Sequence, residues 1–551
     1  MRRRTAVGLG VSDFCKLREA GRPYVDRSAE IGDLLCLGNE VSVICRPRRF
    51  GKSLLLSTIR AFVEPGEGRE ALFSDLAIWR DAEARSYFGR HAVLHVSFKD
   101  LRGPTLEAAL RSFAETVYTE CARLVEVWPG LVSIATPTFQ RMVNAEASPA
   151  DVVNGLRHVM RLLWRVSGAK VVLLVDEYDA PLHQAQQRGY YAEMVGLVRE
   201  MLGSACKENE ALAFAVVTGV LRVSREGLWS SLNNARIYSV MDKGLAGICG
   251  FTEADVAWLL EETQSQLSLA DMRRWYNGYN FSGQILYNPW SVINAVQSDE
   301  LRAWWVDSGS NEALGALIRA GGPAVQRDLV RWMEGETLPA SFGDNILLRE
   351  DRAEDVVPLL VHSGYLSPVS VSSDGEAWRV TLRVPNRDAL MALRSSVYQW
   401  LSQMRYGRTE VDGLLRALLV GSPSFGEHLG ALLLAVSAAE DFPFPDKERG
   451  YHAFLLGLLC GLRPRYQVAS NLESGLGRAD ILVIPLEAGD PGVVIEMKRA
   501  PTAEAGPGLV AVALEQARAR RYDARLREAG AARVVLWGIA FCGKECWVES
   551  A

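Results

Sequence analysis

Residues 46–53 carry the first pattern of residue types that could do chemistry. They read R-P-R-R-F-G-K-S, directly after the apolar run Val41–Cys45 and directly before three leucines. This order of residues predicts a strand, then a turn, then the start of a helix. Such a segment can bind phosphate, because the backbone N–H groups at a helix N-terminus can donate to an anion. Lys52 would neutralise the β- and γ-phosphates, and the Ser53 hydroxyl would reach Mg²⁺. We therefore expect ATP and Mg²⁺ at Arg46, Pro47, Arg48, Arg49, Phe50, Gly51, Lys52 and Ser53.

The loop departs from the pattern G-x-x-x-x-G-K-[ST] at its first position, where this chain has Arg46. Glycine normally lets the backbone approach the phosphates, so Arg46 and Pro47 must shape the turn differently. Two interpretations of the basic residues stay open. Arg46, Arg48 and Arg49 could add positive charge around the triphosphate, or they could form a solvated face, which is the commoner fate of a short basic run.

A second signature is the apolar run Val171–Val175, which is followed by Asp176 and Glu177. Ligands of open α/β sheets bind at the carboxyl ends of the strands, so both carboxylates would lie at the nucleotide. We expect Asp176 to hold Mg²⁺ through its water shell. Glu177 would be the general base or would orient the attacking water. With the loop, this signature predicts ATP hydrolysis.

Two further residues belong to a third apolar run, Ala213–Thr218, and to the segment after it. Thr218 would end a strand between the two phosphate-site strands and sense the γ-phosphate; the alternative is an ordinary strand-ending threonine. Arg222 could reach the γ-phosphate as an arginine finger, or it could make a surface salt bridge. A finger that acts in trans would imply a homo-oligomer.

A second group of residues near the end of the chain comprises Asp480, Glu496 and Lys498. Residues i and i+2 of a strand share a face, so Glu496 and Lys498 would point the same way, and Asp480 on a neighbouring strand could join them. Two carboxylates beside an ammonium suit Mg²⁺-dependent hydrolysis of a phosphodiester. The carboxylates hold the metal, and the lysine stabilises the developing charge or positions the nucleophile. Taken alone, the pattern more often marks an edge-strand salt bridge.

The elements around this group favour a nuclease fold. Glu448, on a preceding helix, could be a further metal ligand, and Gln516, on a following helix, could orient water or touch the substrate. A plain solvated side chain is the alternative for both. The stretch Gln516–Arg527 is rich in arginine, which suits the phosphates of DNA or RNA. The alternative there is a solvated helix face with i,i+4 charge pairs.

The elements that must position the first site alternate between strand and helix over the first 250 residues. Short valine-rich runs bounded by helices predict an α/β fold class with a parallel sheet covered on both faces. The expected strands are Val41–Cys45, Ala92–Phe98, Val171–Val175 and Ala213–Thr218, and the expected helices are Lys52–Val63, Leu106–Val127, Asp151–Val166 and Tyr190–Cys206.

The rest of the chain changes character twice. We expect a mostly helical lid or middle region at 251–410, after an ATPase domain at 1–250 and before a nuclease-like α/β domain at 411–551. The middle region has helical patterns at Glu253–Glu262 and Ala313–Ala320. For the last domain we expect helices Lys447–Leu462 and Ala503–Glu528 and strands Tyr466–Ser470, Ala479–Ile484, Val493–Met497, Arg533–Phe541 and Glu545–Glu549.

Size and composition limit the possible functions. A chain of 551 residues is too long for one core, and a net charge of −5 gives no global attraction to nucleic acid, so any contact must be a local patch. No apolar run reaches the roughly 18 residues of a membrane helix. Nine scattered cysteines, an odd number, suit reduced thiols, and no apolar segment follows the basic start. We expect a cytoplasmic protein without membrane contact.

Segments along most of the chain resemble bacterial AAA-ATPase-like proteins, in which the loop also reads R-P-R-R-F-G-K-S. Arg46 thus looks like a family feature. The resemblance implies a P-loop NTPase sheet of the ASCE/AAA type. It rests on 13–14, 24–27, 46–53, 175–179, 232–234, 250–252, 275–279 and 287–290. One departure is Arg27, where lysine is frequent.

The end of the chain resembles the PD-(D/E)XK nuclease domain that is usually fused to such ATPases. The resemblance rests on 448–452, 470–471, 477–480 and 496–498. It implies a restriction-endonuclease-like fold, a Mg²⁺ cofactor and a nucleic-acid partner, with DNA preferred. It also implies an ATP-dependent nuclease linked to mobile elements or genome defence.

Two functions compete. The first is a metal-dependent nuclease that is gated by ATP binding and hydrolysis. The second is a nucleotide-switched nucleic-acid-binding or scaffold protein whose terminal domain keeps the nuclease fold without cutting. The joint presence of Asp480, Glu496 and Lys498 argues against the second, since a scaffold needs none of them.

Overall fold

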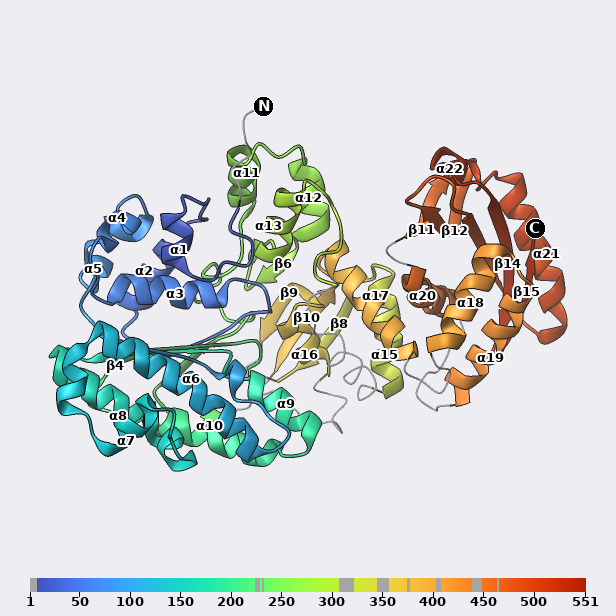
Figure 1. The fold of residues 1–551 in the computed structure, drawn as a ribbon. Helices are drawn as coiled ribbons and strands as arrows, with labels where there is room; N and C mark the ends of the chain where they lie inside the picture. The colour runs from blue at the N-terminus through green and yellow to red at the C-terminus, as the bar shows by residue number, and fades with distance from the viewer. Residues whose placement is uncertain are drawn as a thin grey trace. The chain divides into compact units, whose positions relative to one another are not determined.

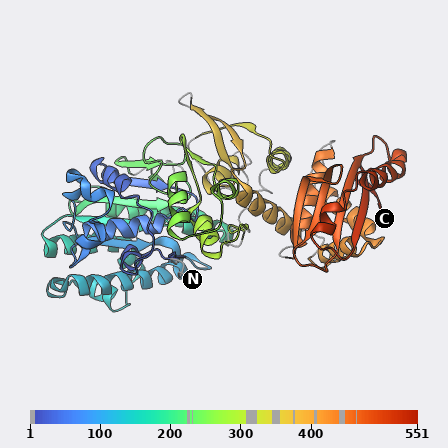
Figure 2. The same cartoon turned by 90° about the horizontal axis from the view of Figure 1, so that it is seen from above.

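The computed structural model describes residues 7–222, 228–229, 232–306, 322–343, 356–373, 377–402, 408–438, 448–462 and 465–551. The chain forms two compact units (Figure 1, Figure 2). The first comprises Met1–Trp305, Pro339–Arg349 and Val357–Asp388, and the second comprises Val306–Leu338, Glu350–Val356 and Ala389–Ala551. Residues 251–410 are thus divided between the units. The helix expected at Ala313–Ala320 lies outside the described residues.

The first unit is built on a five-stranded sheet in the order β2-β3-β4-β1-β5, with all neighbours parallel. Its strands are β1 Val41–Cys45, β2 Val93–Ser97, β3 Val171–Asp176, β4 Leu212–Gly219 and β5 Ala235–Tyr238. The predicted parallel sheet is confirmed, and β5 adds an edge strand. Because β4 lies between β1 and β3, the loop after β1, the end of β3 and the end of β4 meet at one edge of the sheet.

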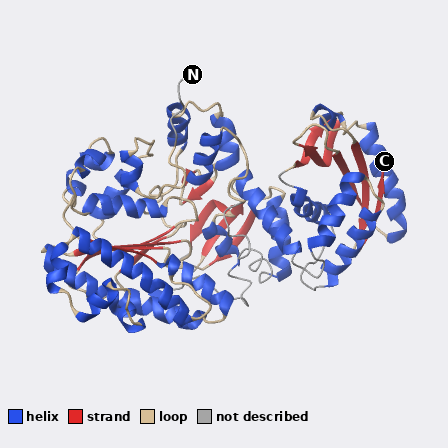
Figure 3. Cartoon of the chain, in the orientation of Figure 1, coloured by secondary structure: helices blue, strands red, loops and turns tan. Residues whose placement is uncertain are grey.

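Helices cover both faces of this sheet, with α3 on one side and α8 and α10 on the other (Figure 3). The bounds of α8 follow from its sequence. Ser148 and Asp151 form a capping box at its start, Pro149 occupies the first turn, and Gly168 ends the helix with φ 70°. The helices of this part are α1 Phe14–Glu19, α2 Ser28–Cys36, α3 Lys52–Val63, α4 Arg69–Phe73, α5 Ala82–Arg85, α6 Leu106–Val127, α7 Pro137–Val143, α8 Pro149–Ser167, α9 Ala180–Arg188 and α10 Tyr191–Cys206.

The residues after the first sheet form helices, as predicted, and also strands that the sequence did not indicate. The buried rings of Tyr276, Tyr279 and Tyr287 anchor the aromatic-rich segment in the core. A three-stranded sheet has the order β8-β10-β9. The elements are α11 Glu253–Glu262, α12 Leu269–Tyr276, β6 Tyr279–Phe281, β7 Gln284–Leu286, α13 Pro289–Ser298, α15 Gly322–Met333, β8 Leu338–Phe342, α16 Val356–Ser363, β9 Ser367–Ser373, β10 Trp378–Arg383 and α17 Arg387–Ser402.

The second unit is built on a five-stranded sheet in the order β11-β12-β13-β14-β15. Only β13 and β14 run parallel, and α21 makes the crossover between them. The elements are α18 Arg408–Val420, α19 Ser424–Ala438, α20 Glu448–Leu459, β11 Tyr466–Ser474, β12 Gly477–Pro485, β13 Gly492–Arg499, α21 Gly506–Ala519, α22 Ala524–Glu528, β14 Val534–Cys542 and β15 Glu545–Ser550. The predicted mixed α/β unit is confirmed.

The single long helix expected at Ala503–Glu528 is wrong. A short 3₁₀ turn precedes α21, and the chain then turns before α22. Arg521 has φ 54°, and the ring of Tyr522 is fully buried, so the break brings an aromatic side chain into the core. No glycine or proline marks this break in the sequence. The arginines of Gln516–Arg527 therefore do not share one helix face.

None of the helices in the described ranges combines the length and the apolar character needed to cross a membrane.

Candidate active sites

The loop after β1 ends at Gly51, which begins α3 in a left-handed conformation with φ 89°. No side chain of the described residues caps this helix, so its first N–H groups are left for another acceptor. A β-carbon placed at Gly51 would meet no atom within 4 Å. This open, donor-rich helix start fits a phosphate group.

The carboxylate of Asp176 accepts hydrogen bonds from polar groups that lie at or beyond the ends of three strands of the sheet. Its carboxylate accepts hydrogen bonds from Ser53 Oγ and from Thr218 Oγ1, both at 2.5 Å, and from the Glu177 N–H at 3.0 Å. The structure thus brings Ser53, Asp176 and Thr218 together at the carboxyl edge of the sheet. A serine hydroxyl beside a carboxylate is a donor set that Mg²⁺ accepts, with water and phosphate oxygens completing the shell.

Lys52 is folded back on its own loop. Its Nζ donates to the carbonyls of Arg46 at 3.0 Å and Pro47 at 2.9 Å, and the residue is only 7% exposed. Burial lowers the pKa of this ammonium, while Asp176 and Asp179 oppose the shift. An anionic phosphate would relieve this cost, because a negative charge favours the charged form of a buried lysine.

Glu177 stands in a conformation that a glutamate rarely adopts, with φ 53°. Such strain is found mainly where surrounding structure holds a functional group in place. Burial and, next, the charge of Asp176 raise the pKa of its carboxyl, and Lys52, Lys99 and Arg48 act in the opposite direction. A carboxylate with a raised pKa is a better proton acceptor from water.

Arg46 is fully buried, which excludes the solvated-face interpretation for this residue. Its guanidinium donates to the carbonyls of Cys45 and Tyr238, both at 2.9 Å, and of Leu245 at 2.7 Å. These acceptors tie the end of β1 to the end of β5 and to the turn beyond it. Because both terminal nitrogens of its guanidinium donate there, the Arg46 side chain shapes the loop.

The remaining loop residues divide between solvent and core. Arg48 and Arg49 are exposed, and the Arg49 guanidinium lies 4.0 Å from the centre of the Trp290 ring. Phe50 is buried, with its ring 5.0 Å from that of Tyr279. Pro47 is buried as well. The loop is therefore anchored on the aromatic-rich segment of the same unit.

Two residues with structural roles at this site, Tyr178 and Asp179, received no role from the sequence. Asp179 accepts from the N–H groups of Val220 at 3.0 Å and Leu221 at 2.8 Å, and the Tyr178 hydroxyl donates to the Leu221 carbonyl at 2.5 Å. They hold the segment after β4. Asp179 is the third acidic residue of the V-D-E-Y-D run, and this cluster of acidic residues was the sequence signal for it.

Arg222, at the end of this held segment, makes an ion pair with Asp242 at 3.5 Å. Its side chain is only 12% exposed, so the pair is not a surface salt bridge of the kind the sequence suggested. A finger role would require Arg222 to exchange this partner for a phosphate.

The second site gathers Asp480, Glu496, Lys498 and Gln516 from β12, β13 and α21. Lys498 Nζ donates to Glu496 Oε1 at 3.0 Å, and Gln516 Nε2 donates to the same oxygen. Asp480 Oδ2 accepts from the Met497 N–H at 2.8 Å, across the antiparallel pair. Strands and helix thus bring these four predicted residues into one place.

Glu496 is 1% exposed, and its Oε2 has no hydrogen-bond partner among the described residues. Burial and then the charge of Asp480 raise the pKa of this carboxyl, and Lys498 opposes the shift. A water molecule or an ion can satisfy a buried oxygen that has no protein partner. No cluster of three His, Cys, Asp or Glu residues that could hold a metal occurs within the described ranges. Two carboxylates nevertheless suffice for Mg²⁺ when water and substrate phosphates complete the shell.

A cavity of about 660 Å³ opens on this group. Its other lining residues include Arg478, Arg520 and Tyr522. Arg520 and Tyr522 reach the cavity because the chain breaks between α21 and α22, which the sequence did not predict.

Behind the site, His452 Nε2 lies 3.1 Å from the Asp480 carbonyl oxygen and 3.2 Å from Ser470 Oγ. His452 lies four residues after Glu448 on the same helix, and this spacing was the sequence signal that could have indicated a role for it. Glu448 begins α20, and its side chain lies outside the described part of the chain.

Comparison with known proteins gives a family for two parts of the chain. A family model described as a predicted AAA-ATPase matches residues 8–229, and a model of the PD-(D/E)XK nuclease superfamily matches residues 446–551. An uncharacterized protein in the vnfD 5′ region of Azotobacter chroococcum mcd 1 is 30% identical over 399 residues, 72% of this chain and 70% of that protein. A Walker-type ATPase of Pyrococcus abyssi is 11% identical, with a TM-score of 0.36 over 72% of this chain and 99% of that one. This chain belongs to the AAA-ATPase-like family and carries a C-terminal domain of the PD-(D/E)XK nuclease superfamily.

Proposed function

We propose that this protein binds and hydrolyses ATP and cuts nucleic acid, DNA in the first instance, in a reaction that needs Mg²⁺ and is gated by ATP. The observation that carries the proposal is Glu496. This carboxylate is buried and has one oxygen fixed by Lys498 and Gln516, while the other oxygen has no partner among the described residues. A pure scaffold has no use for such a group, because an unmatched buried acceptor costs stability.

At the ATP site, each residue is proposed to do one part of the reaction. The N–H groups at the start of α3 and Lys52 hold the phosphates, and Ser53 and Asp176 hold Mg²⁺ with its water. Glu177 takes a proton from the attacking water. Thr218, held against Asp176, senses whether the γ-phosphate is present. The hydrogen bonds among Ser53, Asp176 and Thr218 support this assignment.

At the nuclease site, Asp480 and Glu496 would hold Mg²⁺, which when bound polarises the scissile phosphate and lowers the pKa of a water. Lys498 lies beside Glu496 and is proposed to stabilise negative charge that develops on the phosphate. Gln516 orients the Glu496 carboxylate. His452 fixes the backbone of Asp480 from behind. The cavity in front of these groups gives room for a phosphodiester.

A cleavage assay with matched variants tests the nuclease part. Plasmid DNA, linear DNA, single-stranded DNA and RNA are incubated with Mg²⁺ and ATP and the wild type, Glu496→Gln or Lys498→Ala. We expect both variants to lose activity by about 100-fold or more, because each removes a group that acts on the reacting phosphate. Arg499→Ala is the control, because Arg499 is exposed and alternates to the other face of β13. Equal cutting by wild type and Lys498→Ala, or no cutting of any substrate by the wild type, would refute this part.

A further inference from the structure

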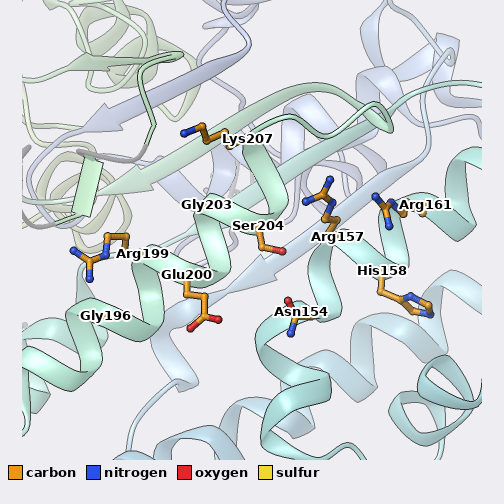
Figure 4. A pocket seen from close by; sticks show the side chains of 10 residues that line it. All are labelled: Asn154, Arg157, His158, Arg161, Gly196, Arg199, Glu200, Gly203, Ser204 and Lys207. Carbon is orange, nitrogen blue, oxygen red and sulfur yellow. The ribbon is translucent and has the colours of Figure 1, made fainter.

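A groove of about 910 Å³ lies between α8 and α10 in the first unit. Figure 4 shows Asn154, Arg157, Glu200 and Ser204 around the space between the two helices. The side chains of Arg199 and Lys207 lie on the other side of α10 and point away from α8 in this view. None of these residues belongs to the ATP site or to the nuclease cavity. The groove is therefore a separate feature of the surface.

The sequence of α10 keeps this groove open. Gly196 and Gly203 are seven residues apart and hence on one face of the helix. A β-carbon at Gly196 would meet no atom within 4 Å, so no packing requirement explains the absence of a side chain there. Small residues on one helix and long basic residues on its neighbour leave a channel with a polar lining.

The groove is strongly cationic, although the whole chain is acidic with a net charge of −5. Its lining has four cationic side chains and one carboxylate, namely Arg157, Arg161, Arg199, Lys207 and Glu200. No ion pair of Arg161 or Lys207 occurs within the described ranges. A cluster in which cationic side chains outnumber carboxylates attracts an anionic partner.

Arg157 is held in place at this groove. Its Nη2 donates to the Glu208 carbonyl at 3.0 Å, and its buried Nε has no hydrogen-bond partner among the described residues. Arg161 follows one turn later on α8, a rise of about 6 Å. His158 bonds instead to Thr136 Oγ1 at 2.6 Å. Burial and the charge of Arg161 lower the pKa of His158, so it stays neutral near pH 7.

We propose that this groove binds the sugar–phosphate backbone of a nucleic acid and gives the ATPase unit its own, sequence-independent grip on the substrate. Arginine and lysine, with serine and asparagine as further donors, are the side chains that contact phosphates without reading bases. The choice of nucleic acid over an acidic polypeptide rests on the proposed function. The groove thus adds a binding surface that the nuclease site alone does not provide.

The test measures binding and not cutting, so that it stands apart from the nuclease assay. The full chain is titrated in EDTA against a fluorescent 20-base single-stranded DNA and the corresponding duplex at several salt concentrations. The test variant is Arg161→Gln/Lys207→Gln, in which both changed residues are exposed and outside the core. We expect affinity to fall by about tenfold or more. The slope of log K against log salt should become shallower by about 2, since each lost phosphate contact removes about 0.9.

Arg90→Gln/Arg236→Gln is the matched control, since it removes the same charge from two exposed residues of the same unit that do not line the groove. The thermal unfolding midpoint of each variant checks its fold. Three results overturn the proposal: an unchanged salt slope in the groove variant, an equal loss in the control, or binding of poly-glutamate that competes with DNA and depends equally on Arg161 and Lys207. If the protein does not cut DNA but this change in slope is measured, the proposal for the groove is supported and the proposed nuclease activity is refuted.

Discussion

The chemistry proposed for both sites depends on partly or fully buried glutamates. Burial is the largest cause of the raised pKa of Glu177 and of Glu496, and a neighbouring aspartate adds to the shift in each case. A nearby lysine limits the shift at both positions. In the proposed mechanism, one of these carboxylates accepts a proton and the other binds a cation.

The first residue-level prediction concerns Glu177→Gln. The amide keeps the size of the side chain but cannot accept the proton of water, so ATP turnover should fall by about 10²- to 10⁴-fold while ATP binding is retained. Steady-state ATPase rates and equilibrium binding of a fluorescent ATP analogue measure the two effects separately. Wild-type turnover in this variant would show that another group is the base.

The second prediction is a pH dependence of metal binding. Mg²⁺ needs the ionised form of Glu496, and the pKa of this carboxyl is raised, so a proton competes with the metal at higher pH than for an ordinary glutamate. Mg²⁺ affinity, measured by calorimetry without substrate, should fall as the pH decreases through this raised pKa.

Lys498→Met sharpens this test. The lysine lowers the pKa of Glu496, so its removal should move the loss of Mg²⁺ affinity to higher pH. An affinity that is independent of pH, or a shift to lower pH in the variant, is incompatible with Glu496 as a ligand.

Residue types and spacing indicated several residues that the structure brings together, but not their neighbours. Asp176, Ser53, Asp480, Glu496, Lys498 and Gln516 could be found because strand ends and alternation place them. The burial of Arg46 could not be predicted from the sequence, because two of the carbonyl groups that it contacts lie on β5 and on the turn near Leu245, far away in sequence. The same holds for Tyr522, which reaches the nuclease cavity through a turn without a sequence signal.

At the level of elements, periodicity predicted the strands and helices that bear both sites. The bounds of β1, α3, α6 and α11 agree with the sequence to the residue. The breaks were harder to predict. The chain leaves the helical path between α21 and α22 because Tyr522 packs in the core and the Arg520 carbonyl accepts a hydrogen bond from the Leu476 N–H, at the tip of the β11–β12 hairpin. This is a tertiary effect.

The tip of the β11–β12 hairpin gives a prediction about how these elements pack. Gly475 joins β11 to β12 with φ 58°, and a β-carbon there would lie 2.2 Å from the Arg521 carbonyl oxygen and 2.3 Å from that of Arg520. Gly475→Ala should cost about 3 kcal/mol or more, since backbone atoms must move, and should disturb the nuclease cavity. Urea unfolding and hydrogen exchange of β11 and β12 measure the loss.

Gly543→Ala is the matched control for this steric effect. Gly543 also has φ 58°, but nothing lies within 4 Å of its added β-carbon. The control should cost only about 1 kcal/mol, from backbone strain alone. Equal costs for the two variants would mean that the hairpin tip does not press on the segment between α21 and α22.

At the scale of the whole molecule, the AAA-ATPase-like domain and the PD-(D/E)XK nuclease superfamily domain belong to different compact units. The sequence indicated both chemistries and the α/β character of both units, since each site has its own motif. It did not indicate the division of residues 251–410 between the units, because that division depends on contacts between distant segments. The proposed control of DNA cleavage by ATP requires both units, so it can be tested only with the whole chain.

The most direct test of the central claim compares DNA cleavage and ATP hydrolysis by wild type, Lys52→Ala and Lys498→Ala under the same conditions with Mg²⁺. We predict that the wild type cuts faster with ATP than without it, and that Lys498→Ala hydrolyses ATP without cutting. Lys52→Ala should do neither, because it lacks the ammonium that holds the phosphates. Cutting by Lys52→Ala at the wild-type rate, with or without ATP, would contradict an ATP-gated nuclease.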